Sequence, residues 1–334
     1  MSTEVRAGRR TVSVSKPDKV LFPDDGLTKL DLARYYEAVA PVALPHLRDR
    51  PLTLNRFPDG IDGEGWVQQR ASDHFPDWVR RVRVGKKGGT VDHVVANDPG
   101  TLVYLADQAC ITLHPWLSRA DRLERPDRLI VDLDPPSDDF AAVRWAARAL
   151  GDLLLELGLE PHAMLTGSRG VHVVCPLQRR SDFDEVRRFA RELARLAAAR
   201  DPQGLTTEQR KAKRGDRILV DVARNAWAQT AVGPYSVRPL PGAPVATPLH
   251  WEELGDSCLR PRAFTVGNLA RRLDRDGDPW TGIAQHARPL GGARRRLRAL
   301  GEEPLRPRLG GPGSRRAPRA CGSRSPRSGG CARG

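Results

Sequence analysis

The sequence lacks the features that mark membrane-embedded, secreted or disulfide-stabilised proteins. None of its apolar runs approaches the roughly twenty residues needed to cross a bilayer. The N-terminus contains no apolar segment of the kind found in a signal peptide. The five cysteines are scattered, and no two of them form a Cys-x-x-Cys pair. These absences argue against a membrane span, secretion, a disulfide framework and a zinc site, and they favour a reducing cytoplasm.

Positive charge is concentrated at one end of the chain. The 334 residues carry a formal net charge of +14, but residues 288–334 supply +11 of it through 13 arginines and two glutamates. Residues 1–287 carry only +3. A nucleic-acid partner for the folded part must therefore be argued from particular residues. Residues 301–334 are rich in Gly, Pro, Arg and Ser, and we expect them to form a disordered basic tail that would attract phosphates without sequence preference.

Residues 128–222 show a regular alternation of strand and helix signals. The first helix is expected to be capped by Ser137 and ended by Gly158. The second helix, over 182–200, is expected to begin with a pair that resembles a capping box, Ser181 and Asp184. Strands are expected at 128–134, 162–166, 171–177 and 218–222. The order β-α-β-β-α-β is the split βαβ unit of ferredoxin-like domains, in which the fourth and third strands flank the first.

This strand order brings carboxylates together. Asp132 and Asp134 alternate with apolar residues on the first strand, so they share one face about 7 Å apart. Asp221 on the fourth strand also faces away from the helices, and His172 on the third strand can face the same site. An Asp-x-Asp pair alone is more often two solvated acids. Three converging carboxylates are the oxygen ligands that Mg²⁺ or Mn²⁺ prefers, with room left for substrate phosphates.

A glycine-rich turn lies at the same end of the predicted sheet. The turn, Gly167-Ser-Arg-Gly170, has backbone N–H groups that could cradle a triphosphate, and Arg169 would supply positive charge. Together with the carboxylates, it suits two-metal phosphoryl transfer.

The first third of the chain is less regular. Thr28 with Asp31 predicts the start of a helix, strand-like runs follow at 52–57 and 66–69, and residues 102–106 belong to a second helix. No linker divides residues 1–300 into independent domains. We expect an N-terminal subdomain over about 10–125, a catalytic unit over about 126–250 and a helical extension over about 251–290.

Several motifs resemble, in order, the primase-polymerase domain of bacterial DNA ligase D, a member of the archaeo-eukaryotic primase superfamily. They include Leu-His-Pro-Trp at 113–116, Thr-Gly-Ser-Arg-Gly-Val-His-Val at 166–173 and Leu-Val-Asp-Val at 219–222. Further matching stretches lie at 18–23, 27–36, 50–54, 58–63, 231–238 and 241–249. The resemblance covers roughly residues 10–290. It implies an α+β primase-polymerase fold, with a β-α-β-β-α-β (RRM/ferredoxin-like) catalytic palm packed on an N-terminal α/β subdomain.

The resemblance also implies roles for individual residues. Asp132, Asp134 and Asp221 match the triad that binds two Mn²⁺ or Mg²⁺ ions. Lys19 and Lys29 match lysines that hold the 5′-phosphate of a downstream DNA strand, since phosphate contacts position a protein without reading sequence. The nucleotide triphosphate would be bound by Arg56, His114, Thr166, Ser168, Arg169, His172 and Arg238.

The implied function is metal-dependent nucleotidyl transfer. The enzyme would extend a DNA 3′ end and fill short gaps with ribonucleotides or deoxyribonucleotides during non-homologous end joining. Its partners would be gapped or broken DNA, nucleoside triphosphates, a DNA ligase and the Ku end-binding protein, at the bacterial nucleoid. No Lys-x-Asp-Gly adenylation motif occurs in the sequence, so we interpret the chain as a stand-alone polymerase or as a piece separated from a larger protein.

Departures from the family pattern leave alternatives open. The chain has Trp66-Val-Gln-Gln69 where the family often has two aromatic residues followed by Gln-Lys, and Asn55 replaces a basic residue beside Arg56. Weaker nucleotide binding is expected, with Trp66 or Phe57 as the base-stacking platform. A catalytically inactive nucleic-acid-binding module on the same fold is the alternative, although such modules display aromatic residues on the sheet face that here carries acids. An Asp-x-Asp phosphatase is disfavoured, because two prolines follow the second acid where a hydroxyl is expected.

Overall fold

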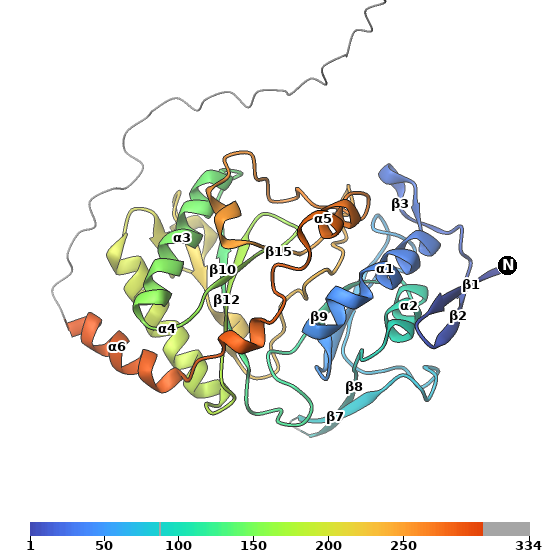
Figure 1. The fold of residues 1–334 in the computed structure, drawn as a ribbon, viewed down its shortest axis with the longest axis horizontal. Helices are drawn as coiled ribbons and strands as arrows, with labels where there is room; N and C mark the ends of the chain where they lie inside the picture. Colours follow the sequence, from blue (N-terminus) through green and yellow to red (C-terminus); the bar gives the residue numbers. More distant parts are fainter. Residues whose placement is uncertain (87, 303–334) are drawn as a thin grey trace, which may run out of the picture.

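The computed structural model describes residues 1–86 and 88–302. They form two lobes lying side by side, one around helices α1 and α2 and the other around strands β10 and β12 (Figure 1). Each lobe has its own apolar core. Within these described ranges, no helix has both the length and the apolar character needed to cross a membrane. The tail predicted for residues 301–334 lies outside the described residues, except that residues 301 and 302 end the last helix.

The N-terminal lobe is built on a five-stranded antiparallel sheet. Strand β5 lies at its centre and pairs with β6, β8 and β9, while β7 pairs with β8. Two small hairpins, β1–β2 and β3–β4, precede and adjoin helix α1. The elements are β1 (Ser2–Ala7), β2 (Arg10–Ser15), β3 (Val20–Phe22), the short 3₁₀ helix η1 (Pro23–Asp25), β4 (Leu27–Thr28), α1 (Lys29–Leu47), β5 (Leu52–Arg56), β6 (Trp66–Gln68), β7 (Arg81–Lys86), β8 (Gly89–Val94), α2 (Pro99–Asp107) and β9 (Cys110–Pro115).

Helix α1 fixes the position of β9, which carries His114. The helix begins as predicted, because the Thr28 hydroxyl accepts from the Asp31 N–H and the Asp31 carboxylate accepts from the Thr28 N–H. Its buried Tyr36 donates a hydrogen bond of 2.6 Å to the carbonyl of Ile111 on β9. The helix is thus held both at its start and along its buried face.

The second lobe contains the predicted palm. Its six-stranded sheet has the order β13-β14-β10-β12-β11-β15, which confirms that the fourth and third palm strands flank the first. Two further short strands extend the sheet at its edges. The elements are β10 (Arg128–Asp134), α3 (Phe140–Glu156), β11 (His162–Leu165), β12 (Val171–Pro176), α4 (Phe183–Arg200), β13 (Leu205–Thr206), η2 (Lys211–Lys213), β14 (Ile218–Asp221), η3 (Ala223–Asn225) and β15 (Thr247–Leu249).

The two palm helices begin later than the sequence suggested. Helix α3 is capped by Asp139, whose carboxylate accepts from the backbone N–H groups of residues 141 and 142, so Ser137 is not the cap. Helix α4 is capped by Asp182 with Glu185, one residue beyond the predicted Ser181–Asp184 pair. In both cases the cap is a carboxylate, a stronger acceptor for the free N–H groups than a neutral hydroxyl. Gly158 follows the end of α3 as predicted, with φ of +76°.

The palm face opposite α3 and α4 is only partly open. Ile130, Met164 and Val174 on that face pack with Trp280 and other apolar residues into a third core. The expected open face is therefore covered over the middle of the sheet, and the strand ends that carry Asp132 and Asp134 remain accessible at a pocket. Residues 235–245, assigned to the palm from sequence, place Tyr235, Val237 and Val245 in the core of the N-terminal lobe.

C-terminal segments close the structure. Helix α6 continues to Glu302, beyond the end expected for the helical extension, and its Arg294 forms an ion pair of 3.1 Å with Glu185 on α4. The remaining elements are η4 (Trp251–Gly255), α5 (Leu269–Asp276), η5 (Ile283–His286) and α6 (Leu290–Glu302). Among them, Leu269 of α5 joins the core of the first lobe, and Asp278 contacts His46 of α1, so this part of the chain links the palm to the first lobe.

Candidate active site

Asp132 is the central residue of the site. It lies directly opposite Asp221 on β14 and directly opposite His172 on β12. The His172 Nε2 atom is 3.5 Å from the Asp132 carboxylate. The alternation of strand residues and the palm strand order therefore predicted both neighbours correctly.

A pocket of about 190 Å³ opens beside these residues. It gathers most of the predicted nucleotide-binding residues around the first two carboxylates, together with four side chains that had no assigned role. Its lining is His114, Asp132, Asp134, Thr166, Ser168, Arg169, Gly170, His172, Arg224, Thr230, Ala231, Val232 and Arg238. One wall thus comes from β9 of the first lobe, and the rest from the palm and the segment after β14.

The glycine-rich turn is held tightly against β10. The Thr166 hydroxyl donates to the Gly170 carbonyl at 3.1 Å and accepts from the Ser168 N–H at 3.4 Å. Gly167 has φ of +67°, a conformation that side-chain-bearing residues rarely adopt. A Cβ atom at Gly170 would collide with the Leu133 carbonyl oxygen. Both glycines are therefore required for the turn to lie against the strand that carries the acids.

The charges in the pocket favour an anionic ligand. Burial would raise the pKa of Asp132, but His172 and the nearby Arg224 and Arg238 outweigh it and hold that pKa below its usual value. Burial and the same two arginines lower the pKa of His114 to about 3, so its imidazole is neutral at physiological pH. Two buried nitrogens, Nδ1 of His172 and Nε of Arg238, have no hydrogen-bond partner among the described residues. Such groups are normally satisfied by a ligand or by ordered water.

The carboxylates fit a divalent cation in type and backbone position, but their side chains do not converge. Arg214 donates to Asp134 at 3.0 Å, and Arg169 lies 3.8 Å from the same carboxylate. Asp221 accepts from the N–H of Ala223 at 2.8 Å and lines a neighbouring groove. Across residues 1–86 and 88–302, no three His, Cys, Asp or Glu side chains are grouped closely enough to hold a metal ion. Metal binding would require Asp134 and Asp221 to turn toward Asp132.

A protein-family comparison identifies the relatives of this arrangement. The model of the family described as LigD, primase-polymerase domain, matches residues 28–280. The chain belongs to this family. The match spans β9 with His114, all three predicted metal ligands and the segment that ends at Trp280.

Individual LigD proteins agree with the family match. The multifunctional non-homologous end joining DNA repair protein LigD of Mycobacterium tuberculosis is 31% identical over 281 residues, which are 81% of this chain and 37% of that protein. LigD of Pseudomonas aeruginosa is 33% identical over 305 residues, 87% of this chain and 35% of that protein. The chain thus spans little more than a third of the length of these relatives.

The solved structure is the polymerase domain of Mycobacterium tuberculosis ligase D in complex with DNA. It matches this chain with a TM-score of 0.77 at 30% identity, covering 83% of this chain and 99% of the solved one. The α+β primase-polymerase fold expected from the sequence is therefore confirmed.

Arg56 lies apart from the other predicted nucleotide-binding residues of this LigD-family domain. It is on β5, where its guanidinium donates to the Gln108 carbonyl and the Gln68 side chain and lies 5.2 Å from the ring centroid of Trp66. It does not line the pocket that contains Asp132. Trp66 is 45% exposed, so it could stack on a base, whereas Phe57 is packed against the first core.

The two predicted phosphate-binding lysines are neighbours in different environments. The Lys29 N–H donates to the Lys19 carbonyl, which places their backbones side by side. The Lys29 ammonium is buried and pairs with Asp107 at 3.1 Å, with a further hydrogen bond to Ser15. The Lys19 side chain is one-third exposed, and its ammonium contacts the exposed Asp59 at 2.6 Å. Of the two, Lys19 is the one whose charge a DNA phosphate could reach.

Sequence reasoning missed Arg214 and Arg224. Arg224 follows Asp221 by three residues in η3, and its guanidinium reaches the pocket because the chain turns directly after β14. Arg214 lies in a loop that the sequence marked only as charged. The position of Arg224, three residues after Asp221, could have indicated that it lies near the site. No feature of the sequence indicated that Arg214 pairs with Asp134.

Proposed function

We propose that this chain is a metal-dependent nucleotidyltransferase that extends a DNA 3′ end and fills short gaps with ribonucleotides or deoxyribonucleotides in non-homologous end joining. The observation that best supports this proposal is the pocket in which Asp132 and Asp134 face Arg169, Arg238 and the glycine-rich turn. Acids on one side and phosphate-binding groups on the other suit a nucleoside triphosphate whose reacting phosphate lies between them.

The residues of the site would have different roles in the reaction. The unpartnered Nδ1 of His172 and Nε of Arg238, with the turn at 167–170, would bind and orient the triphosphate. The neutral His114 would contact the nucleotide from β9 without adding charge. Two Mn²⁺ or Mg²⁺ ions held by Asp132, Asp134 and Asp221 would supply charge stabilisation and a more reactive 3′-hydroxyl. Gapped or broken DNA, a DNA ligase and Ku are the partners we propose.

Primer extension tests this proposal directly. The substrate is a gapped DNA with a downstream 5′-phosphate, supplied with Mn²⁺ or Mg²⁺ and one ribonucleotide at a time. We expect addition of the nucleotide complementary to the template, and addition that depends on the metal. If the folded protein binds the gapped DNA but adds no nucleotide, the chain is instead an inactive nucleic-acid-binding module on the same fold.

Lys19→Gln is expected to remove the advantage of a downstream 5′-phosphate. One charge-assisted contact to a phosphate contributes about 1.5–3 kcal/mol, so the loss in extension efficiency should be about tenfold or more on phosphorylated DNA. The melting temperature should not change, because the Lys19–Asp59 pair is exposed. The measurement compares extension on gapped DNA with and without the 5′-phosphate.

Lys86→Gln, on the exposed edge strand β7, serves as the matched control for charge. It should keep the full response to the 5′-phosphate. Equal losses in the two variants would show that Lys19 contributes only to general attraction of DNA. Lys29→Gln should instead lower stability, because it leaves the buried carboxylate of Asp107 without a cationic partner.

A further inference from the structure

A second cavity, of about 790 Å³, lies where the two lobes and the C-terminal segment meet. It is bounded by Pro41, Val42 and Pro45 of α1, the end of β12, and the segment around η5. Arg128, the first residue of β10, lines it, whereas Asp132 and Asp134 lie at the other end of that strand. At about 3.3 Å per residue, Arg128 is about 13 Å from Asp132, and the two cavities share no lining residue.

Arginines dominate the polar lining of this cavity. The charged lining groups are Arg50, Arg119, Arg128, Arg179, Asp127 and Asp278, and the remaining titratable group is His46. Burial lowers the pKa of His46, which keeps its imidazole neutral at physiological pH. The ionised lining therefore carries four positive and two negative charges.

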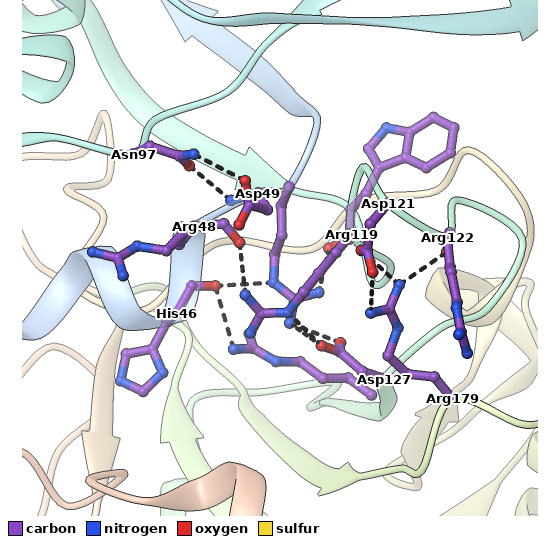
Figure 2. Close-up of polar contacts among 12 residues, drawn as sticks. His46, Arg48, Asp49, Asn97, Arg119, Asp121, Arg122, Asp127 and Arg179 are labelled. Atoms are coloured by element: carbon purple, nitrogen blue, oxygen red, sulfur yellow. Dashed lines mark hydrogen bonds and ion pairs between the residues drawn. The ribbon is translucent and has the colours of Figure 1, made fainter.

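Three of the arginines are already paired. Arg50 and Arg119 both donate to the Asp127 carboxylate, at 2.7 Å and 2.9 Å. Arg179 forms a two-point contact with Asp121, at 2.8 Å for each bond. Figure 2 shows the bonds from Arg119 to Asp127 and from Arg179 to Asp121. The other acid of the lining, Asp278, accepts from His46, Tyr235 and the backbone of Trp280.

Arg128 is the arginine left without a carboxylate. Within the described part of the chain, its hydrogen bonding is limited to the His46 carbonyl, at 3.3 Å. The residue is only 7% exposed. Burial and repulsion from Arg50 and Arg119 outweigh the attraction of the neighbouring Asp127 and lower the pKa of Arg128 to about 9. A buried guanidinium with spare donors is costly unless an anion satisfies it.

We infer that this cavity binds a small organic phosphate, with its phosphate on Arg128 and its apolar part against the α1 prolines and Ile283. Because Asp121 already neutralises Arg179, the positive charge left over is that of Arg128. The three terminal oxygens of a phosphate monoester can accept from more of its spare donors than the two oxygens of a carboxylate can. The volume suits a drug-sized ligand, and the mixture of apolar wall and few polar groups is typical of such sites. A ligand here would contact α1, β10 and η5 together and so stabilise the junction between the lobes.

Isothermal titration calorimetry with phenyl phosphate, at pH 7.5 in EDTA, tests the inference on the whole chain. We expect saturable binding that weakens at least tenfold in Arg128→Met. Arg238→Gln, which alters the phosphate-binding side of the active-site pocket, should keep the binding of phenyl phosphate that depends on Arg128. Benzoate and phenol should bind more weakly than phenyl phosphate. Binding lost in Arg238→Gln but kept in Arg128→Met would place the ligand in the active-site pocket and overturn the inference.

A second pair of variants leaves the arginine cluster intact. Ala284 is exposed and lines the cavity, so Ala284→Glu adds a competing carboxylate to its wall. Gln285 is also exposed but does not line the cavity, so Gln285→Glu adds a carboxylate one residue away as a control. Phenyl phosphate affinity should fall in Ala284→Glu and stay unchanged in Gln285→Glu. Equal affinities in these two variants, or no binding by the wild type, would overturn the inference even if Arg128→Met failed to fold.

Discussion

Asp132→Asn is expected to reduce the rate of nucleotide addition by about 10³-fold, the scale reached when one charge-stabilising group of an active site is removed. Asp132 lies opposite both Asp221 and His172, so it is the central carboxylate of the proposed metal site. Its lowered pKa means that the side chain is ionised throughout the working pH range. Asparagine keeps the size of the side chain and removes its charge.

The measurement is single-turnover extension of a gapped primer at saturating nucleotide and Mn²⁺. Asp184→Asn makes the same chemical change on the exposed first turn of α4 and should leave the rate unchanged. The melting temperature of Asp132→Asn should stay close to that of the wild type, because the contact between His172 and Asp132 is long, at 3.5 Å. A rate within threefold of the wild type would exclude Asp132 as a metal ligand and remove the basis for the triad.

The end of the palm that carries the proposed metal ligands was predictable because it depends on backbone periodicity. Alternation along 128–134 and 218–222 decided which side chains share a face, and the flanking strand order decided which strands adjoin. Both rules act through hydrogen-bonded pairing, which admits few alternatives. The pairing of Asp132 with Asp221 therefore followed from the sequence, and the structure confirms it.

Features that depend on which of several neighbouring side chains makes a contact were harder to predict. Ser137 and Asp139 are both good caps, and only the path of the chain after β10 decides between them. The burial of Lys29 against Asp107 depends on α2 packing beside α1, a contact between residues 78 positions apart. The pairing of Arg214 with Asp134 likewise joins a loop to a strand. Long-range side-chain contacts of this kind leave no periodic signal in the sequence.

Asp127→Asn is expected to destabilise the folded protein by about 3–5 kcal/mol, the usual cost of leaving a buried ion pair with one charge. Asp127 accepts from Arg50 and Arg119 at the junction of the lobes, and Arg128 lies close enough to lower its pKa as well. Asparagine would leave these arginines to repel one another without a counter-charge. The free energy of unfolding from urea titration measures the effect.

Two further variants separate charge balance from lost hydrogen bonds. Asp121→Asn breaks the pair with Arg179, but Asp121 is 61% exposed, so its cost should stay below about 1 kcal/mol. Adding Arg128→Met to Asp127→Asn should recover part of the lost stability, because it removes one of the mutually repelling charges. If the double variant is no more stable than Asp127→Asn, repulsion within the cluster is not the cause of the loss.

The pH dependence of stability gives an independent check on the same carboxylate. Burial alone would raise the pKa of Asp127, but Arg50, Arg128 and Arg119 together lower it from 3.8 to about 2. The stabilisation it provides is therefore complete above the unfolded pKa near 4 and is lost as the pH falls toward 2. Over that interval the stability difference between the wild type and Asp127→Asn should shrink. A difference that stays constant down to pH 2 would mean that the hydrogen bonds of Asp127, and not its charge, hold the two lobes together.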